Sequence, residues 1–253
     1  MKIIENIPYG GIIHPNRCLD LYIPDKLNES ISIAFLVHGG AWCTGDRKDL
    51  GPLATELANR GVVTATAGYR LTTKDGKSEI VAPMHTQDVA DGLTMLHDRI
   101  KEYIHFQPSG VVLHGHSAGA HITGLISLQS GWVSDTVASW IKRNVSSEGI
   151  FCIEQLLKEY PSYGDWFLFH AFPDRSTWDR YSLYKKPFRK IPQTIVHSEQ
   201  DSLLRYALSD EYFKHVSEIP GSDSHLLHGY DHDEVLQAKE FYDLLSGYFV
   251  LIQ

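Results

Sequence analysis

A serine flanked by glycines at a predicted strand-to-helix junction constrains this chain more than any other feature. Residues 115–119 read Gly-His-Ser-Ala-Gly, after the apolar residues 111–113 and before the helical pattern of residues 120–125. A serine at such a junction adopts a strained backbone that only small neighbours permit, and its hydroxyl stands clear of the sheet. The five-residue pattern alone occurs by chance in many chains, where it is simply a tight glycine turn. Between a strand and a helix it predicts that Ser117 is a nucleophile.

The order of apolar runs and helical patterns predicts an α/β protein. Short apolar runs alternate with longer segments of helical periodicity, which is typical of a mostly parallel sheet with helices on both faces. We expect residues 1–253 to form a single domain, with an aromatic- and proline-rich cap insertion around residues 148–187. The predicted strands are residues 31–38, 61–67, 111–114, 141–146 (the weakest), 194–197 and 224–227; the predicted helices are 85–103, 118–128, 203–216 and 234–249.

Composition narrows the class of protein. The net charge of -8, with no run of Lys or Arg, argues against a nucleic-acid partner. The three cysteines form no C-x-x-C pair and indicate a reducing compartment. No segment approaches the roughly 20 apolar residues of a membrane helix, and the first residues lack a signal-peptide core. We therefore expect a soluble cytoplasmic protein with no membrane partner; the sequence leaves a homodimer open.

A serine nucleophile needs a base that is oriented by a carboxylate. Asp201 follows the predicted strand 194–197, at the edge of the sheet where an acid is expected, although an aspartate there also suits a helix N-cap. Glu199 is the rival acid. Among the downstream histidines, His232 lies in a loop just before an acidic helix start and is the preferred base, with His228 as its rival.

Two other kinds of site are disfavoured. His225, His228 and His232 have a spacing that suggests a metal cluster, but Gly229 and Tyr230 make a helix there improbable, so we expect no metal. The glycines of residues 40–45 have the spacing of a phosphate-binding loop, but Asp-Arg follows where Lys-Ser/Thr is required. We expect no cofactor.

The backbone after the first predicted strand offers the second half of a hydrolase site. Gly39 and Gly40, between His38 and Ala41, have no side chains. The backbone amide groups in this segment can therefore approach a developing oxyanion without a steric clash. We expect Gly40 and Ala41, together with Ala118, to form the oxyanion hole.

At these residues the chain resembles the kynurenine formamidase (arylformamidase) family of α/β-hydrolases. The resemblance rests on HGGAW (His38, Gly39, Gly40, Ala41, Trp42), on GHSAGAH (Gly115 to His121, including Gly119), on an Asp after the penultimate strand and on a His before the last helix. Residues 149–173 together with VHSEQDSLL look most like the fungal branch, and residues 19–24 (LDLYIP) are typical of related esterases.

The resemblance implies Ser117 as nucleophile, Asp201 as acid, His232 as base, and an oxyanion hole from Gly40 and Ala41. The implied reaction converts N-formyl-L-kynurenine, a small aromatic formamide, into formate and L-kynurenine, in tryptophan degradation towards NAD. The same machinery would serve a carboxylesterase acting on small acyl esters, or, with a broken triad, a binding module. For the formamidase we expect the aromatic segment 160–172 and Trp42 to stack on the substrate ring, and a cation or backbone donors to hold its amino-acid end.

Overall fold

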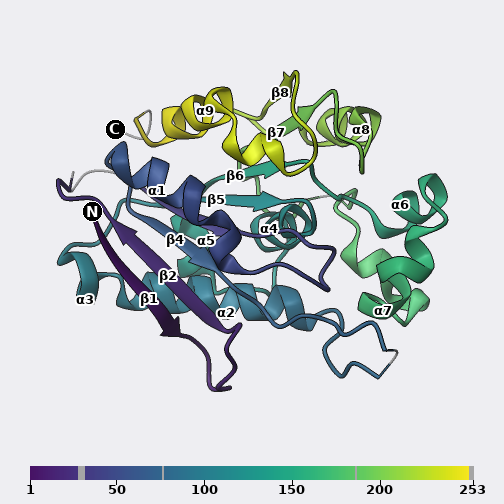
Figure 1. Cartoon of the computed structure of the whole chain (residues 1–253), viewed down its shortest axis with the longest axis horizontal. Helices are drawn as coiled ribbons and strands as arrows, with labels where there is room; N and C mark the ends of the chain where they lie inside the picture. The colour runs from purple at the N-terminus through teal and green to yellow at the C-terminus, as the bar shows by residue number, and fades with distance from the viewer. Residues whose placement is uncertain (28–31, 76, 186, 251–253) are drawn as a thin grey trace.

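The protein is built around one twisted sheet, seen in the computed structural model of Figure 1, which describes residues 1–27, 32–75, 77–185 and 187–250. Within these residues eight strands lie in the order β1-β2-β4-β3-β5-β6-β7-β8. The first two pairs in that order, β1·β2 and β2·β4, are antiparallel, and every later pair is parallel. The strands are β1 (Lys2–Pro8), β2 (Cys18–Ile23), β3 (Ile33–Val37), β4 (Thr64–Ala67), β5 (Val111–His116), β6 (Ile141–Ser147), β7 (Gln193–Ser198) and β8 (Asp223–Leu227).

The central strands are buried on both faces, which is why they read as continuous apolar runs. In β3, Ile33 and Phe35 belong to one apolar cluster while Ala34 and Leu36 belong to another. Because successive side chains of a strand point to opposite faces, the two clusters are the cores on the two sides of the sheet.

Helices cover both faces, as the alternating pattern predicts. The smaller core packs under α1 (Gly51–Asn59) and α9 (Lys239–Val250), and the larger core under α2 (Met84–Arg99), α4 (Ala118–Leu128), α5 (Asp135–Trp140) and α8 (Tyr206–Val216). Short helices complete the chain: η1 (Arg47–Leu50), α3 (Lys101–Ile104) and η4 (Glu234–Gln237).

The predicted insertion is present between β6 and β7. It contains α6 (Ile153–Glu159), the π-helical turn η2 (Gly164–Leu168), α7 (Phe169–Ala171) and the 3-10 segment η3 (Arg175–Tyr181). Figure 1 shows α6 and α7 beyond the end of the sheet towards which β5 and β6 run. The insertion therefore stands at the carboxyl ends of the central strands, where α/β sheets place their ligand crevice.

Several predicted boundaries differ from the structure. Residue 31, the first of a predicted strand, lies outside the described residues, and β3 begins at Ile33. The helix predicted from residue 203 begins only at Tyr206, and the helix predicted over 234–249 is divided by Ala238, whose ψ of 129° is extended. Helix α1 and strands β1 and β2 were not predicted. No helix in the described part of the chain has the length and apolarity needed to cross a membrane.

Candidate active site

Ser117 occupies the sharp turn between β5 and α4. Its φ of 53° and ψ of -117° lie in a region that L-residues rarely adopt. A Cβ on Gly115 would lie 2.3 Å from the carbonyl oxygen of Gly119, and one on Gly119 would lie 2.3 Å from the carbonyl oxygen of Val37. Both glycines are therefore needed for the close packing of α4 against β5 and β3. The turn leaves the serine 7% exposed, at the wall of a cavity.

The loop after β3 folds against this serine. A Cβ on Gly39 would lie 3.0 Å from the Cβ of Ser117. Gly40 and Ala41 have φ values of 96° and 52°, and the amides of Cys43 and Thr44 both donate back to the carbonyl of Gly40, at 3.0 and 2.9 Å. The turn formed by these left-handed residues fixes the orientation of the peptide groups at Gly40 and Ala41.

Ala118 is the first residue of α4, where helical amides have no partner within the helix. Gly40 and Ala41 line the same cavity as Ser117. The three predicted oxyanion donors thus lie on the two segments that meet at the serine.

Two other residues of the HGGAW motif are structural. The ring of His38 stacks on that of Tyr69, with centroids 4.4 Å apart, and its Nδ1 lies 2.8 Å from the carbonyl oxygen of Gly39. Trp42 is 1% exposed and meets the ring of Phe172 edge-on at 4.8 Å. The expectation that Trp42 stacks on a substrate is therefore wrong: its indole packs into the core behind the loop and does not line the cavity.

Asp201 and His232 form a buried pair. Nδ1 of His232 lies 2.8 Å from Oδ2 of Asp201, and neither side chain is more than 7% exposed. The other carboxylate oxygen accepts hydrogen bonds from the amides of Leu203 and Leu204, at 2.7 and 2.9 Å. Asp201 therefore has both of the roles that the sequence left as alternatives: one carboxylate oxygen caps the turn, and the other pairs with the histidine.

The charge state of Asp201 follows from these contacts. Burial raises its pKa, but the hydrogen bonds from His232 and Glu148 and the neighbouring imidazole outweigh burial and hold the pKa well below its usual range. The carboxylate therefore stays ionised and accepts from Nδ1 of the imidazole, which directs the other ring nitrogen, Nε2, away from the pair.

Glu199 and His228, the alternative acid and base considered from the sequence, pair with each other. Nδ1 of His228 lies 2.9 Å from Oε2 of Glu199, and the side chains are 66% and 58% exposed. His225, in β8, lies 3.4 Å from Asp223 and from the hydroxyl of Tyr248. Neither histidine lines the cavity, whereas His232 does.

A buried acid that sequence reasoning missed lies beneath Asp201. Glu148 follows β6 with a φ of 47° and a fully buried side chain. Its Oε1 accepts from the amide of Ser198 at 2.8 Å, its Oε2 lies 3.0 Å from Nδ1 of His197, and its carboxyl is hydrogen-bonded to Asp201. Burial and the adjacent carboxylate raise the pKa of Glu148 to about 10, so that it is a neutral acid beside an ionised one.

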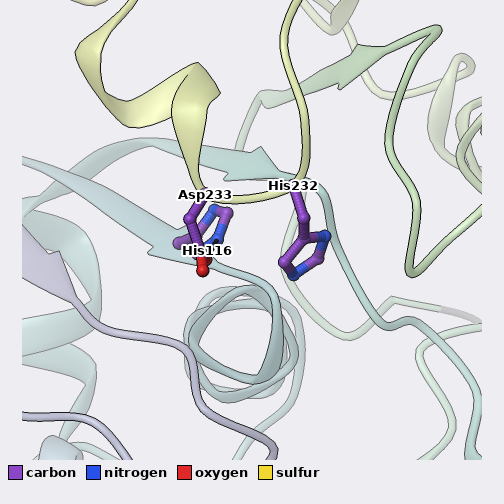
Figure 2. Close-up of side chains that lie close together, drawn as sticks. All are labelled: His116, His232 and Asp233. Atoms are coloured by element: carbon purple, nitrogen blue, oxygen red, sulfur yellow. Dashed lines mark hydrogen bonds and ion pairs between the residues drawn. The ribbon is translucent and has the colours of Figure 1, made fainter.

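A second imidazole–carboxylate pair borders the first. Figure 2 shows Asp233 against His116, with His232 beside them on the loop that follows β8. Nε2 of His116 lies 3.0 Å from Oδ1 of Asp233, and its Nδ1 lies 3.0 Å from the hydroxyl of Ser147. The rings of His116 and His232 are 4.9 Å apart. Burial lowers the pKa of His116, so this imidazole is a neutral neighbour of His232.

Among the described residues, two groups bring histidine and carboxylate atoms within 4.8 Å of one another: His116, His232 and Asp233, and Glu148, Asp201 and His232. In both groups the facing atoms are already joined by hydrogen bonds, as given above. A zinc ion would need its ligand atoms about 2.0–2.3 Å away, in place of these bonds. We therefore assign no metal to either group.

The loop after β3, the turn at Ser117 and the loop after β8 border one cavity of about 480 Å³, a size suited to a small organic molecule. Ser117 and His232 lie on its wall, and the cap contributes Tyr163, Trp166 and Phe167 from η2 and the residue before it. The aromatic segment predicted to face a substrate therefore does line the cavity, in part.

Comparison with known proteins identifies the family to which this chain belongs. The family model BD-FAE matches residues 19–160, more than half of the chain. The chain belongs to the BD-FAE family.

Relatives of this BD-FAE protein are hydrolases. The kynurenine formamidase of Salmo salar is 26% identical over 230 residues, which are 87% of this chain and 70% of that protein. The kynurenine formamidase of Danio rerio is 28% identical over 223 residues, or 84% and 68%. These matches confirm the resemblance to kynurenine formamidases; both proteins come from fishes and do not support the fungal branch.

Solved structures show the fold. Esterase B from Lactobacillus rhamnosis superimposes with a TM-score of 0.79 at 20% identity, over 98% of this chain and 86% of that one. The BD-FAE protein thus has the α/β-hydrolase fold, as the sequence predicted. Together the comparisons support a serine hydrolase of the α/β-hydrolase type.

Proposed function

We propose that this protein hydrolyses N-formyl-L-kynurenine to formate and L-kynurenine. One observation carries the proposal: the strained Ser117 and His232, whose imidazole is paired with the buried Asp201, border a single cavity that aromatic side chains of the cap also line. The similarity to two kynurenine formamidases over most of the chain supports this substrate over other amides and esters.

The reaction begins at the serine. Nε2 of His232 takes the proton of the Ser117 hydroxyl as its oxygen attacks the formyl carbon. Asp201 holds the imidazole through Nδ1 and stabilises the imidazolium that forms. The amides of Ala41 and Ala118, with that of Gly40, stabilise the oxyanion, and each donor of this kind is worth about 3 kcal/mol.

The tetrahedral intermediate then breaks its C–N bond. His232 returns the proton to the departing aniline nitrogen, which leaves kynurenine and a formyl ester on Ser117. A water molecule gives a proton to His232 and attacks this ester. When the second intermediate collapses, formate leaves and the serine recovers its proton.

The cavity suits a small acyl group on a large aryl leaving group. A side chain at residue 39 would crowd the serine, since a Cβ there would lie 3.0 Å from the Cβ of Ser117. A formyl group is the smallest acyl group that this serine could receive. The leaving-group ring is the part that η2 can contact, through Tyr163, Trp166 and Phe167.

We also place the protein in the cytoplasm. All three cysteines lie in the described part of the chain and are free: Cys18 is buried, and Cys43 and Cys152 are half-buried. Free thiols suit a reducing compartment.

The test compares purified protein on N-formyl-L-kynurenine, N-acetyl-L-kynurenine and p-nitrophenyl acetate, with Ser117→Ala as the blank. We expect kcat/KM for the formyl compound to exceed that for its acetyl analogue by more than about tenfold, because one added methyl must enter a filled space. Equal rates on the two kynurenines, or brisk ester hydrolysis with no formamidase activity, would contradict the proposal and favour an esterase.

A further inference from the structure

A lysine lies at the edge of the cavity and has no carboxylate partner among the residues that the structure describes. Lys74 lies in the loop between β4 and α2 and is the one Lys or Arg among the described residues that line the cavity. Its Nζ is 5.5 Å from the ring centre of Trp166. Within the described part of the chain it forms no ion pair, and the neighbouring Asp75 accepts instead from Thr73 and from the amide of Lys77.

The aromatic group beneath this ammonium consists of Tyr163, Trp166 and Phe167, whose rings contact one another. Trp166 meets the ring of Tyr163 edge-on at 5.1 Å and that of Phe167 at 5.2 Å. The Tyr163 hydroxyl donates to the carbonyl of Leu203 at 2.7 Å, which ties the group to the segment after β7. Trp166 is nevertheless 46% exposed, so its ring is accessible from the cavity.

Contacts between distant segments place the lysine and the aromatic group together. Figure 1 shows the loop between β4 and α2 next to α7, and the amide of Ala82 donates to the carbonyl of Ala171 at 2.9 Å. The cation–π contact between Lys74 and Trp166 joins the same loop to η2, the turn that directly precedes α7. The ammonium is therefore held above an aromatic surface at the cavity edge.

The other charged groups of the cavity are carboxylates. Among its described lining residues, Asp49 and Asp233 carry negative charge and Lys74 carries the positive charge. A ligand carboxylate would be repelled by the aspartates and attracted to the lysine, while a ligand ammonium would be attracted to the aspartates. This distribution favours a zwitterionic group on the substrate.

We propose that Lys74 and Trp166 form a subsite for the carboxylate of an aromatic amino acid, with the ring of the substrate on the aromatic group and its carboxylate paired with Nζ. The subsite makes the enzyme selective for aryl amides that carry an amino-acid side chain over neutral aryl amides. This inference rests on the proposed function for the identity of its substrate.

The experiment compares N-formyl-L-kynurenine with 2-formamidoacetophenone, which has the same aryl formamide but no amino-acid group. Lys74→Met removes the charge and keeps the length of the side chain, Lys74→Arg keeps the charge, and Lys77→Met is the matched control on the same loop. We expect Lys74→Met to raise KM for formylkynurenine about five- to tenfold, with kcat little changed, because a partly solvated ion pair is lost. KM for the neutral amide should stay the same, and Lys74→Arg should restore most of the affinity.

Salt gives an independent readout. Raising NaCl from about 20 mM to about 500 mM should increase KM for formylkynurenine in the wild type but not in Lys74→Met, since screening acts on the pair that the variant lacks. Equal effects of Lys74→Met on both formamides, or no effect on either, would overturn the subsite.

A failure of the proposed function is distinguishable from a failure of the subsite. If the wild type does not cleave formylkynurenine, the same variants are compared on phenyl acetate and on 3-(4-acetoxyphenyl)propanoate, an aryl ester that carries a carboxylate. A selective increase of KM for the charged ester in Lys74→Met would support the subsite without the formamidase. Identical KM values in wild type and variant would reject it.

Discussion

Two histidine–carboxylate pairs from the same loops of this protein differ sharply in their surroundings. His232 and Asp201 are buried, with His232 at the cavity wall, whereas His228 and Glu199 are exposed to solvent. An exposed pair is screened and contributes little, while a buried pair fixes the orientation of its imidazole. At the scale of single residues, burial therefore separates the candidate base from its rival.

His232→Ala should lower kcat by about 10⁴- to 10⁶-fold, about as much as Ser117→Ala, because members of a triad act as a unit. His228→Ala should retain most of the activity. In the same assays Asp201→Asn should cost about 10⁴-fold, and Glu199→Gln little. An inactive His228→Ala beside an active His232→Ala would show that the other imidazole is the base.

Glu148 gives a prediction about pH. Its carboxyl is neutral in the folded protein, where its pKa is about 10, and ionises near its usual pKa of about 4.3 in the unfolded chain. The stability that it contributes is complete below the unfolded pKa and is lost as the pH rises towards the folded one. Glu148→Gln stays neutral in both states and removes this loss.

We therefore expect the melting temperature of Glu148→Gln, relative to wild type, to rise between about pH 5 and about pH 9. Thermal unfolding followed by circular dichroism at a series of pH values measures it. A constant difference for Glu148→Gln would mean that the buried carboxyl is ionised in the folded protein.

At the scale of elements, the position of Ser117 depends on how closely α4 approaches β3. The approach is possible because Gly119 presents no Cβ to the carbonyl groups of Val37 and His38, which would lie 2.3 and 2.6 Å away from it. Both obstacles are backbone atoms in a buried strand and its continuation, so they have little freedom to move.

Gly119→Ala should destabilise the protein by about 2 kcal/mol or more and lower kcat, because α4 must move away and displaces Ser117 with it. Gly247→Ala is the matched control: it lies in α9 with nothing within 4 Å of its added Cβ. That change should be neutral or stabilising by up to about 1 kcal/mol. Denaturant unfolding and activity assays measure both; an unaffected Gly119→Ala would refute the packing argument.

At the scale of the whole molecule, a buried ionic network joins the N-terminal ribbon to the helical layer. Asp88 in α2 is fully buried and lies 2.7 Å from a guanidinium nitrogen of Arg70 and 3.2 Å from one of Arg17. Arg17 precedes β2, and Arg70 begins the loop that carries Lys74. The carboxylate thus connects the antiparallel edge of the sheet, α2 and the edge of the cavity.

Asp88→Ala should lower the free energy of unfolding by about 3–5 kcal/mol, because the guanidinium of Arg70 loses its counter-charge and that of Arg17 keeps only Asp91. Asp98→Ala, on the exposed side of the same helix, should change it little. Urea unfolding followed by fluorescence compares the two variants. Similar stabilities for both would show that water replaces the lost carboxylate.

The sequence by itself determined the local features of this protein. The alternation of buried strands and helices, the turn at Ser117 and the bare glycines after β3 follow from side-chain periodicity and backbone sterics, which act over a few residues. For the same reason the helix over 118–128 was predicted at its observed bounds.

Only the tertiary structure decided which distant groups meet. The choice between His228 and His232, the burial of Trp42, and the positions of Glu148 and Lys74 depend on strand order and on how the cap folds over the sheet. Strands β1 and β2 and the division of the last helix at Ala238 were missed because packing, rather than local pattern, stabilises them. The burial of a side chain and the charges around it depend on residues from segments far apart in the chain. A local sequence pattern therefore cannot predict them.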